Sequence, residues 1–129
     1  SDAPWKIVMH HRPGYSAGTT HPSDLGIREN WYPVAEAAGV DLVLTGHNHM
    51  YERSVPIRDG AEVAPGEGTV YLVSGGAGAP LYHSTEDSWF NAVLDSTEHY
   101  AIADLGPDGG TVTVYDLEDN VLDSFEIPK

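Results

Sequence analysis

The stretch Gly39-Val40-Asp41-Leu42-Val43-Leu44-Thr45-Gly46-His47-Asn48-His49-Met50-Tyr51-Glu52-Arg53 decides how this chain folds. Its first part, Val40–Thr45, is a nearly continuous apolar run, which is typical of a strand covered on both faces of its sheet. His47 and His49 follow directly, and in an extended chain residues two apart face the same way, roughly 6 to 7 Å apart. The stretch therefore predicts a buried strand that ends in a pair of candidate metal ligands. Two partly exposed histidines in a turn are the plainer interpretation.

A second strand and a helix are predicted on the N-terminal side of this stretch. Trp5–Met9 has the composition of a buried strand and runs directly into His10 and His11. Residues 25–38 have a helical pattern, with Pro33 predicting a kink or a late start and Gly39 predicting the end of the helix. Strand, loop, helix and strand together favour a β-α-β unit, in which ligand sites lie at the carboxyl ends of the strands. We therefore expect His11 to approach His47 and His49, whereas His10 points to the other side.

The C-terminal part of the chain predicts more strands. Residues 54–57 can form a short strand, and residues 69–74 have a clear strand pattern. Residues 81–96 show no clean period and are expected to form a loop, with or without a short helical turn. Residues 99–105, 111–117 and 121–127 alternate in the manner of strands and are separated by turn residues, which predicts an antiparallel meander. The fold class is therefore α/β, with a mixed β-sheet, one main helix and a C-terminal antiparallel meander, all in one domain.

Composition excludes several classes of function. The chain has 129 residues, of which 6 are basic and 20 acidic, so its formal net charge is −14. Such a charge argues against nucleic acid as a partner. No apolar stretch approaches the roughly 18 residues that a membrane span needs, so no membrane insertion is expected. Because the chain has no cysteine, any metal must be held by His, Asp, Glu, Asn or Tyr.

Further candidate residues carry weaker signals. His21 lies on the predicted loop between the first strand and the helix, where it can overhang the same site as a proton donor or phosphate contact, or remain in solvent. Arg12 and Arg53 are candidate phosphate ligands, although arginines on an acidic surface more often form ordinary ion pairs.

Two blocks of sequence resemble one known family. Residues 5–13, Trp-Lys-Ile-Val-Met-His-His-Arg-Pro, and residues 46–53, Gly-His-Asn-His-Met-Tyr-Glu-Arg, resemble the V-x-x-H and G-H-x-H motifs of the calcineurin-like metallophosphoesterases. The Tyr-Glu-Arg extension is similar to the purple acid phosphatase branch. Residues 71–82 and the predicted meander also resemble that branch, so the likeness covers nearly the whole chain from Trp5.

This resemblance implies a fold and a set of site residues. The fold is a four-layer α/β/β/α sandwich, of which this chain forms a mixed-sheet fragment. His11 and His47 are implied as ligands of the divalent metal and His49 as a ligand of the second metal, iron, while His21 contacts the phosphate or protonates the leaving group. The implied cofactors are two metal ions, iron plus zinc, manganese or a second iron, and the implied substrate is a phosphate ester. Members of this branch are usually exported, which favours a secreted or extracytoplasmic location.

The family carries three further motifs upstream of its V-x-x-H block, namely D-x-[GH], G-D-x-x-Y and G-N-H-[DE], and none of them stands upstream of that block within residues 1–129. G-D and G-N-H occur nowhere in this sequence. By the resemblance the three motifs supply the bridging Asp, the Asn and the Tyr. We therefore interpret residues 1–129 as the C-terminal half of a metallophosphoesterase catalytic domain whose N-terminal half is missing. We expect this chain alone to hold at most one ion weakly, to be inactive, and to self-associate through the exposed half-interface. The alternative is a non-catalytic metal-binding or interaction module.

Overall fold

Short strands and a broken helix form the described part of the chain. The computed structural model describes residues 2–86 and 88–129. In chain order the elements are β1 (Ile7–Met9), α1 (Leu25–Asn30), α2 (Tyr32–Ala37), β2 (Leu42–Thr45), β3 (Tyr51–Ser54), β4 (Ile57–Arg58), β5 (Ala61–Glu62), β6 (Val70–Ser74), β7 (Asn91–Asp95), β8 (His99–Gly106), β9 (Gly109–Asp116) and β10 (Val121–Pro128). No helix within the described ranges is long and apolar enough to cross a membrane.

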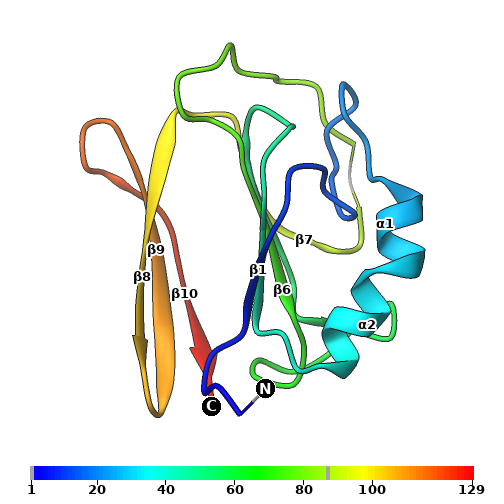
Figure 1. Cartoon of the computed structure of the whole chain (residues 1–129). Coiled ribbons are helices and arrows are strands. Elements are labelled where there is room, and N and C mark those ends of the chain that lie inside the picture. The colour runs from blue at the N-terminus through cyan, green and yellow to red at the C-terminus, as the bar shows by residue number, and fades with distance from the viewer. Residues whose placement is uncertain (1, 87) are drawn as a thin grey trace.

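The main sheet has the strand order β1-β2-β6-β3-β7. β1, β2 and β6 run parallel to one another, whereas β3 is antiparallel to β6 and β7 is antiparallel to β3. A separate sheet of order β10-β9-β8 is the C-terminal antiparallel meander. Figure 1 shows the meander on one side of the main sheet and α1 and α2 on the other. The predicted α/β class, with a mixed sheet and a C-terminal meander, is confirmed.

The helical segment is broken where the sequence predicted. α1 begins after Asp24, whose carboxylate accepts the Ile27 N–H at 3.1 Å and so caps the helix. The chain turns at Trp31, and Pro33 lies in the first turn of α2, where its missing N–H costs no helical hydrogen bond. Gly39 then has a φ of 68°, the left-handed geometry that commonly ends a helix. The helical segment expected over residues 25–38 is therefore confirmed, and of the two alternatives the structure shows the kink, as two short helices that meet at Trp31.

β2 is buried on both faces, as its apolar run predicted. Leu42 packs with Val112, Val114 and other residues of the meander, whereas Val43 packs with Tyr15 and Tyr32 on the helical side. Because successive side chains of a strand point to opposite faces, one short strand joins both parts of the core.

Three expectations about strands are wrong. β1 is an edge strand rather than a buried one, with Ile7 43% and Met9 76% exposed, because only β2 pairs with it in the described part of the chain. The strand expected over residues 54–57 is divided, since β3 ends at Ser54 and β4 begins at Ile57. Residues 81–96, expected to form a loop, contain β7, whose pairing with β3 is a long-range contact that no local period reveals.

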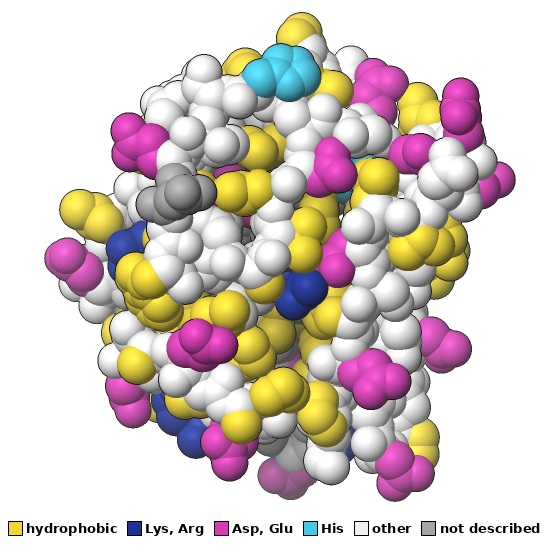
Figure 2. Space-filling model, turned by 180° about the vertical axis from the view of Figure 1, so that it is seen from behind, with side chains coloured by type: hydrophobic (Ala, Val, Ile, Leu, Met, Phe, Trp, Pro, Cys, Tyr) yellow, Lys and Arg dark blue, Asp and Glu magenta, His cyan; other side chains and the backbone are white. Residues whose placement is uncertain are grey.

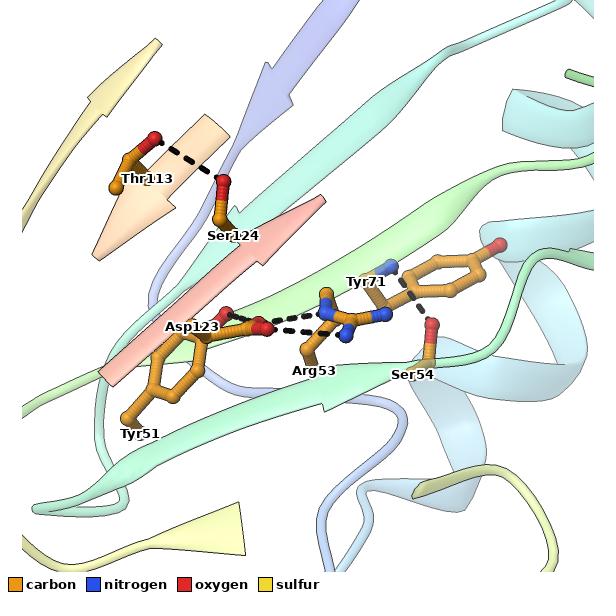
Figure 3. A network of polar contacts seen from close by, with 7 residues as sticks. All are labelled: Tyr51, Arg53, Ser54, Tyr71, Thr113, Asp123 and Ser124. Atoms are coloured by element: carbon orange, nitrogen blue, oxygen red, sulfur yellow. Dashed lines mark hydrogen bonds and ion pairs between the residues drawn. The ribbon is translucent and has the colours of Figure 1, made fainter. Parts of the chain in front are cut away.

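A buried polar network attaches the meander to the main sheet (Figure 3). Asp123 of β10 accepts a hydrogen bond from the Tyr51 hydroxyl at 2.7 Å and bonds from Arg53 at 2.6 and 3.1 Å. Burial by itself raises the pKa of Asp123, but the bonds from Arg53 and Tyr51 outweigh that effect, and the pKa lies below its ordinary value. Burial and the same carboxylate raise the pKa of Tyr51.

Replacing Asp123 should destabilise the fold in a pH-dependent way. Asp123→Asn removes the charge that pairs with Arg53, and we expect the free energy of unfolding at neutral pH to fall by about 1–3 kcal/mol. Because the folded pKa of Asp123 is lowered, its contribution is present above about pH 4 and is lost as the pH falls through the folded value. The difference between variant and wild type in urea unfolding should therefore shrink in acid.

Asp108→Asn is the matched control, because Asp108 is exposed in the turn between β8 and β9. It should change the unfolding free energy by no more than about 0.5 kcal/mol. Equal losses in the two variants would contradict a stabilising role for the network around Asp123.

Candidate metal centre

His11 and His47 meet at the carboxyl ends of β1 and β2. Their parallel pairing extends beyond the strands, with the Gly46 N–H donating to the His11 carbonyl at 3.1 Å. The His11 Nε2 and His47 Nδ1 atoms are 3.1 Å apart, and the rings meet edge to face with centroids 4.9 Å apart. The expected approach of these residues is therefore observed.

The Gly46–His49 segment is a compact turn, so the expectation that His47 and His49 continue the strand is wrong. Backbone bonds link residues two apart, from Asn48 N–H to Gly46 O and from Met50 N–H to Asn48 O, and His47 has a φ of 65°. The His49 ring contacts the segment after β6, whereas His11 contacts His47. The His49 Nδ1 lies 2.8 Å from the Pro80 carbonyl, and the ring stacks on Tyr82 at 4.3 Å between centroids.

His21 lies over His47, with ring centroids 3.8 Å apart and a tilt of 32°. Its loop is closed at the base, because the Ser16 N–H donates to the Ser23 Oγ and that hydroxyl donates to the Ser16 carbonyl. The Tyr82 hydroxyl is 3.5 Å from His21 Nε2. His21 therefore faces the site rather than solvent alone, and together with Arg12 and His47 it lines a small cleft of about 240 Å³.

The surroundings of His47 favour its neutral form. Burial lowers the pKa of His47, and the neighbouring His21, His11 and Arg12 lower it further, since each disfavours a positive charge on the ring. A neutral imidazole has a lone pair for a metal ion.

Arg53, Arg12 and His10 have different surroundings. Arg53 is engaged by Asp123 on the meander side, which removes it as a phosphate ligand. Arg12 lines the cleft and pairs loosely with Asp24 at 3.5 Å. His10 packs against Tyr32, with its Nε2 3.3 Å from the Tyr32 hydroxyl, as expected for a structural residue.

Sequence reasoning missed residues that organise the site. The Tyr82 ring contacts both His21 and His49. It lies in a segment without periodicity, and only its position after the glycine-rich turn that follows β6 could have indicated a role in the site. Asn48 and Glu52 are fully or almost fully buried polar residues within the motif itself. Asn48 and Glu52 are four residues apart, and in a segment expected to be extended this spacing does not predict the contact between them.

The cluster fits part of a metal site. Two imidazole nitrogens on one zinc ion, each bound at about 2.0–2.1 Å in tetrahedral geometry, lie roughly 3.3 Å apart, close to the distance between His11 and His47. A hydrogen bond between the rings has a similar length. Over residues 2–86 and 88–129 there is no group of three or more His, Cys, Asp or Glu side chains arranged to hold an ion. The residues thus provide a pair of ligands rather than a complete centre.

Comparison with known proteins shows which family the chain resembles. The family model of the calcineurin-like phosphoesterases matches residues 1–51. An uncharacterized protein of Mycobacterium tuberculosis is 38% identical over 94 residues, which are 60% of this chain and 18% of that protein. Purple acid phosphatase 18 of Arabidopsis thaliana is 34% identical over 74 residues, 57% of this chain and 17% of that protein. This chain therefore spans less than a fifth of the length of these relatives.

A solved structure has the same fold as this chain. The purple acid phosphatase from yellow lupin seeds superposes with a TM-score of 0.87 at 24% identity, covering 97% of this chain and 25% of that one. At this identity the likeness concerns the fold, and it confirms the predicted metallophosphoesterase architecture. The resemblance to the calcineurin-like metallophosphoesterases is confirmed, and within them the similarity is to the purple acid phosphatase branch.

The ligand pair predicts weak binding by the chain alone. In calorimetric titration with Zn²⁺ we expect at most one ion per chain, because two imidazoles without a carboxylate do not offset the repulsion between two adjacent cations. His47→Ala should abolish this binding. His83→Ala is the control, since His83 is exposed in a loop and should leave the titration unchanged. Stoichiometric binding of two ions would contradict the assignment.

Proposed function

We propose that this chain is the C-terminal part of the catalytic domain of a phosphate-ester hydrolase of the purple acid phosphatase type. In this proposal His11 and His47 bind one metal ion, His49 is directed to a second, and His21 serves the leaving group. The observation that carries it is the 3.1 Å approach of the His11 and His47 nitrogens at the ends of neighbouring parallel strands. The family match over residues 1–51 supports a phosphatase-type activity for the parent protein.

The histidines of the candidate site have different roles in this proposal. His11 and His47 offer ring nitrogens just beyond the ends of paired strands, so little conformational freedom is lost on binding. His21, stacked on His47 and near the Tyr82 hydroxyl, is held where it can donate a proton to a leaving oxygen. Bound metal ions, iron together with zinc, manganese or a second iron by family resemblance, supply the Lewis acidity and the activated water of phosphoester hydrolysis.

The remaining ligands belong to a segment outside residues 1–129. The family resemblance assigns them to the upstream Asp, Asn and Tyr motifs, none of which lies upstream of the V-x-x-H block within residues 1–129. The exposure of Ile7 and Met9 on the edge strand β1 supports a surface that the N-terminal part covers, or that associates with a second copy when uncovered.

Surface charge limits the partners. In Figure 2 the basic side chains lie singly among acidic ones on the face shown. With a net charge of −14 the chain offers no general field for a polyanion, so we propose a small phosphate ester as substrate, attracted locally by the metal ions. By family resemblance we place the parent protein outside the cytoplasm.

Reassembly of the domain tests this function. The chain joined to the upstream segment encoded with it should hydrolyse an aryl phosphate in the presence of iron and zinc, whereas each part alone should not. His47→Ala should abolish turnover, and His21→Ala should lower kcat about 10²-fold or more, as expected for a lost general acid. His83→Ala should retain the wild-type rate.

A non-catalytic metal-binding or interaction module is the second candidate. It is favoured by the lack of a three-ligand group within the described residues. The upstream coding sequence distinguishes the two functions, because the module requires no Asp-, Asn- and Tyr-containing motifs there. A joined protein that binds one ion but does not hydrolyse the ester would favour the module.

A further inference from the structure

The Glu52 carboxylate is buried, and each of its hydrogen bonds within the described residues comes from a donor group. Glu52 lies on β3, is 2% exposed, and receives the Asn48 side-chain amide at 2.7 Å and the Ala17 backbone N–H at 2.7 Å. The Ser16 hydroxyl is 2.9 Å from Oε1, and the Asn91 side-chain amide is 3.4 Å from Oε2. We call these residues the Glu52 network. An acceptor-only carboxylate matches these donors, which is how a buried acidic group is best accommodated.

The Glu52 network joins the two segments that carry the candidate site. One is the loop after Tyr15, where the Ser16 hydroxyl also lies 3.0 Å from the His21 carbonyl, so its single proton serves either that oxygen or Glu52. The other is the turn in which Asn48, with no exposed surface, stands between His47 and His49. The same carboxylate therefore contacts the base of the His21 loop and the middle of the histidine turn.

The two segments approach so closely that a side chain does not fit between them. A Cβ atom at Gly18 would lie 1.9 Å from the Asn48 Nδ2 atom. The Gly18 N–H is 3.3 Å from the Ser16 hydroxyl, which keeps this part of the loop folded against the turn. The loop and the turn are therefore in direct contact, and the Glu52 network supplies hydrogen bonds to both. Backbone bonds from Thr19 to Ser84 and from Glu86 to Ala17 hold the outer side of the loop.

We propose that Glu52 is a positioning residue that sets the distance between His21 and His47. It does so through Asn48 on the turn and through Ser16 and Ala17 on the loop, without touching the imidazoles. The position of His11 relative to His47 has a different origin, because the β1–β2 pairing holds it. Loss of Glu52 should therefore separate His21 from His47 and leave His11 in place. The importance of this spacing for catalysis rests on the proposed function, whereas the spacing itself does not.

Nuclear Overhauser effects between imidazole protons test this selectivity in the metal-free chain. In wild type both the His21–His47 and the His11–His47 contacts should be seen. Glu52→Gln places an amide N–H among donors, and the His21–His47 contact should be lost while the His11–His47 contact remains. Ser54→Ala is the control, since Ser54 is equally buried on β3 and accepts the Tyr71 N–H, but does not reach the loop. It should lower stability and keep both contacts.

Retention of both contacts in Glu52→Gln, or loss of both together, would overturn the proposal. If Glu52→Gln does not fold, Ser16→Ala decides, because it removes one hydroxyl and leaves the carboxylate with its other donors. Loss or weakening of only the His21–His47 contact in Ser16→Ala supports the proposal, and unchanged contacts refute it. These readings need no metal, so failure of the chain to bind Zn²⁺ would count against the proposed function and not against the role of Glu52.

Discussion

The parallel pairing of β1 with β2 is the constraint on which the rest of the site depends. Ile7, Val8 and Met9 pair with Leu42, Val43 and Leu44, and the ladder continues until the Gly46 N–H meets the His11 carbonyl. Because parallel strands end at the same edge of a sheet, the residues that follow them come together although they are far apart in sequence. β2 can impose this register because it is buried on both faces, between the meander and the helices. The edge strand β1, exposed on its outer side, contributes His11 while depending on β2 for its position.

The Tyr51-Glu52-Arg53 triplet extends this arrangement to the rest of the chain. Successive residues of a strand point to opposite faces, so Tyr51 and Arg53 reach Asp123 in the meander whereas Glu52 reaches the loop before His21. The Asp123 and Glu52 carboxylates are both buried. Each receives hydrogen bonds from its own donors, which offsets the cost of removing the charge from water. The polar part of the motif therefore has a structural explanation that does not require contact with substrate. The imidazoles beside it remain available for chemistry.

The sequence predicted the elements that depend on local pattern. The apolar run of β2, the broken helix between Asp24 and Gly39, and the alternating strands of the meander were all correct, because each is encoded by neighbouring residues. The exposure of β1 and the existence of β7 were not predicted, since both depend on which distant strands pair. Within the site, the approach of His11 to His47 followed from strand order. The contacts of the His49 ring could not be predicted from strand order, because the left-handed backbone of His47 and the stacking of His49 on Tyr82 are tertiary features.

In the proposed function, His11 and His47 form one wall of a metal centre. Anomalous X-ray diffraction at the zinc absorption edge, from crystals of this chain grown with Zn²⁺, tests it most directly. We expect an anomalous peak within bonding distance of both the His11 Nε2 and the His47 Nδ1 atoms, with the His21 ring still lying over His47. A peak at other side chains, with the His11 and His47 rings turned apart, would contradict it.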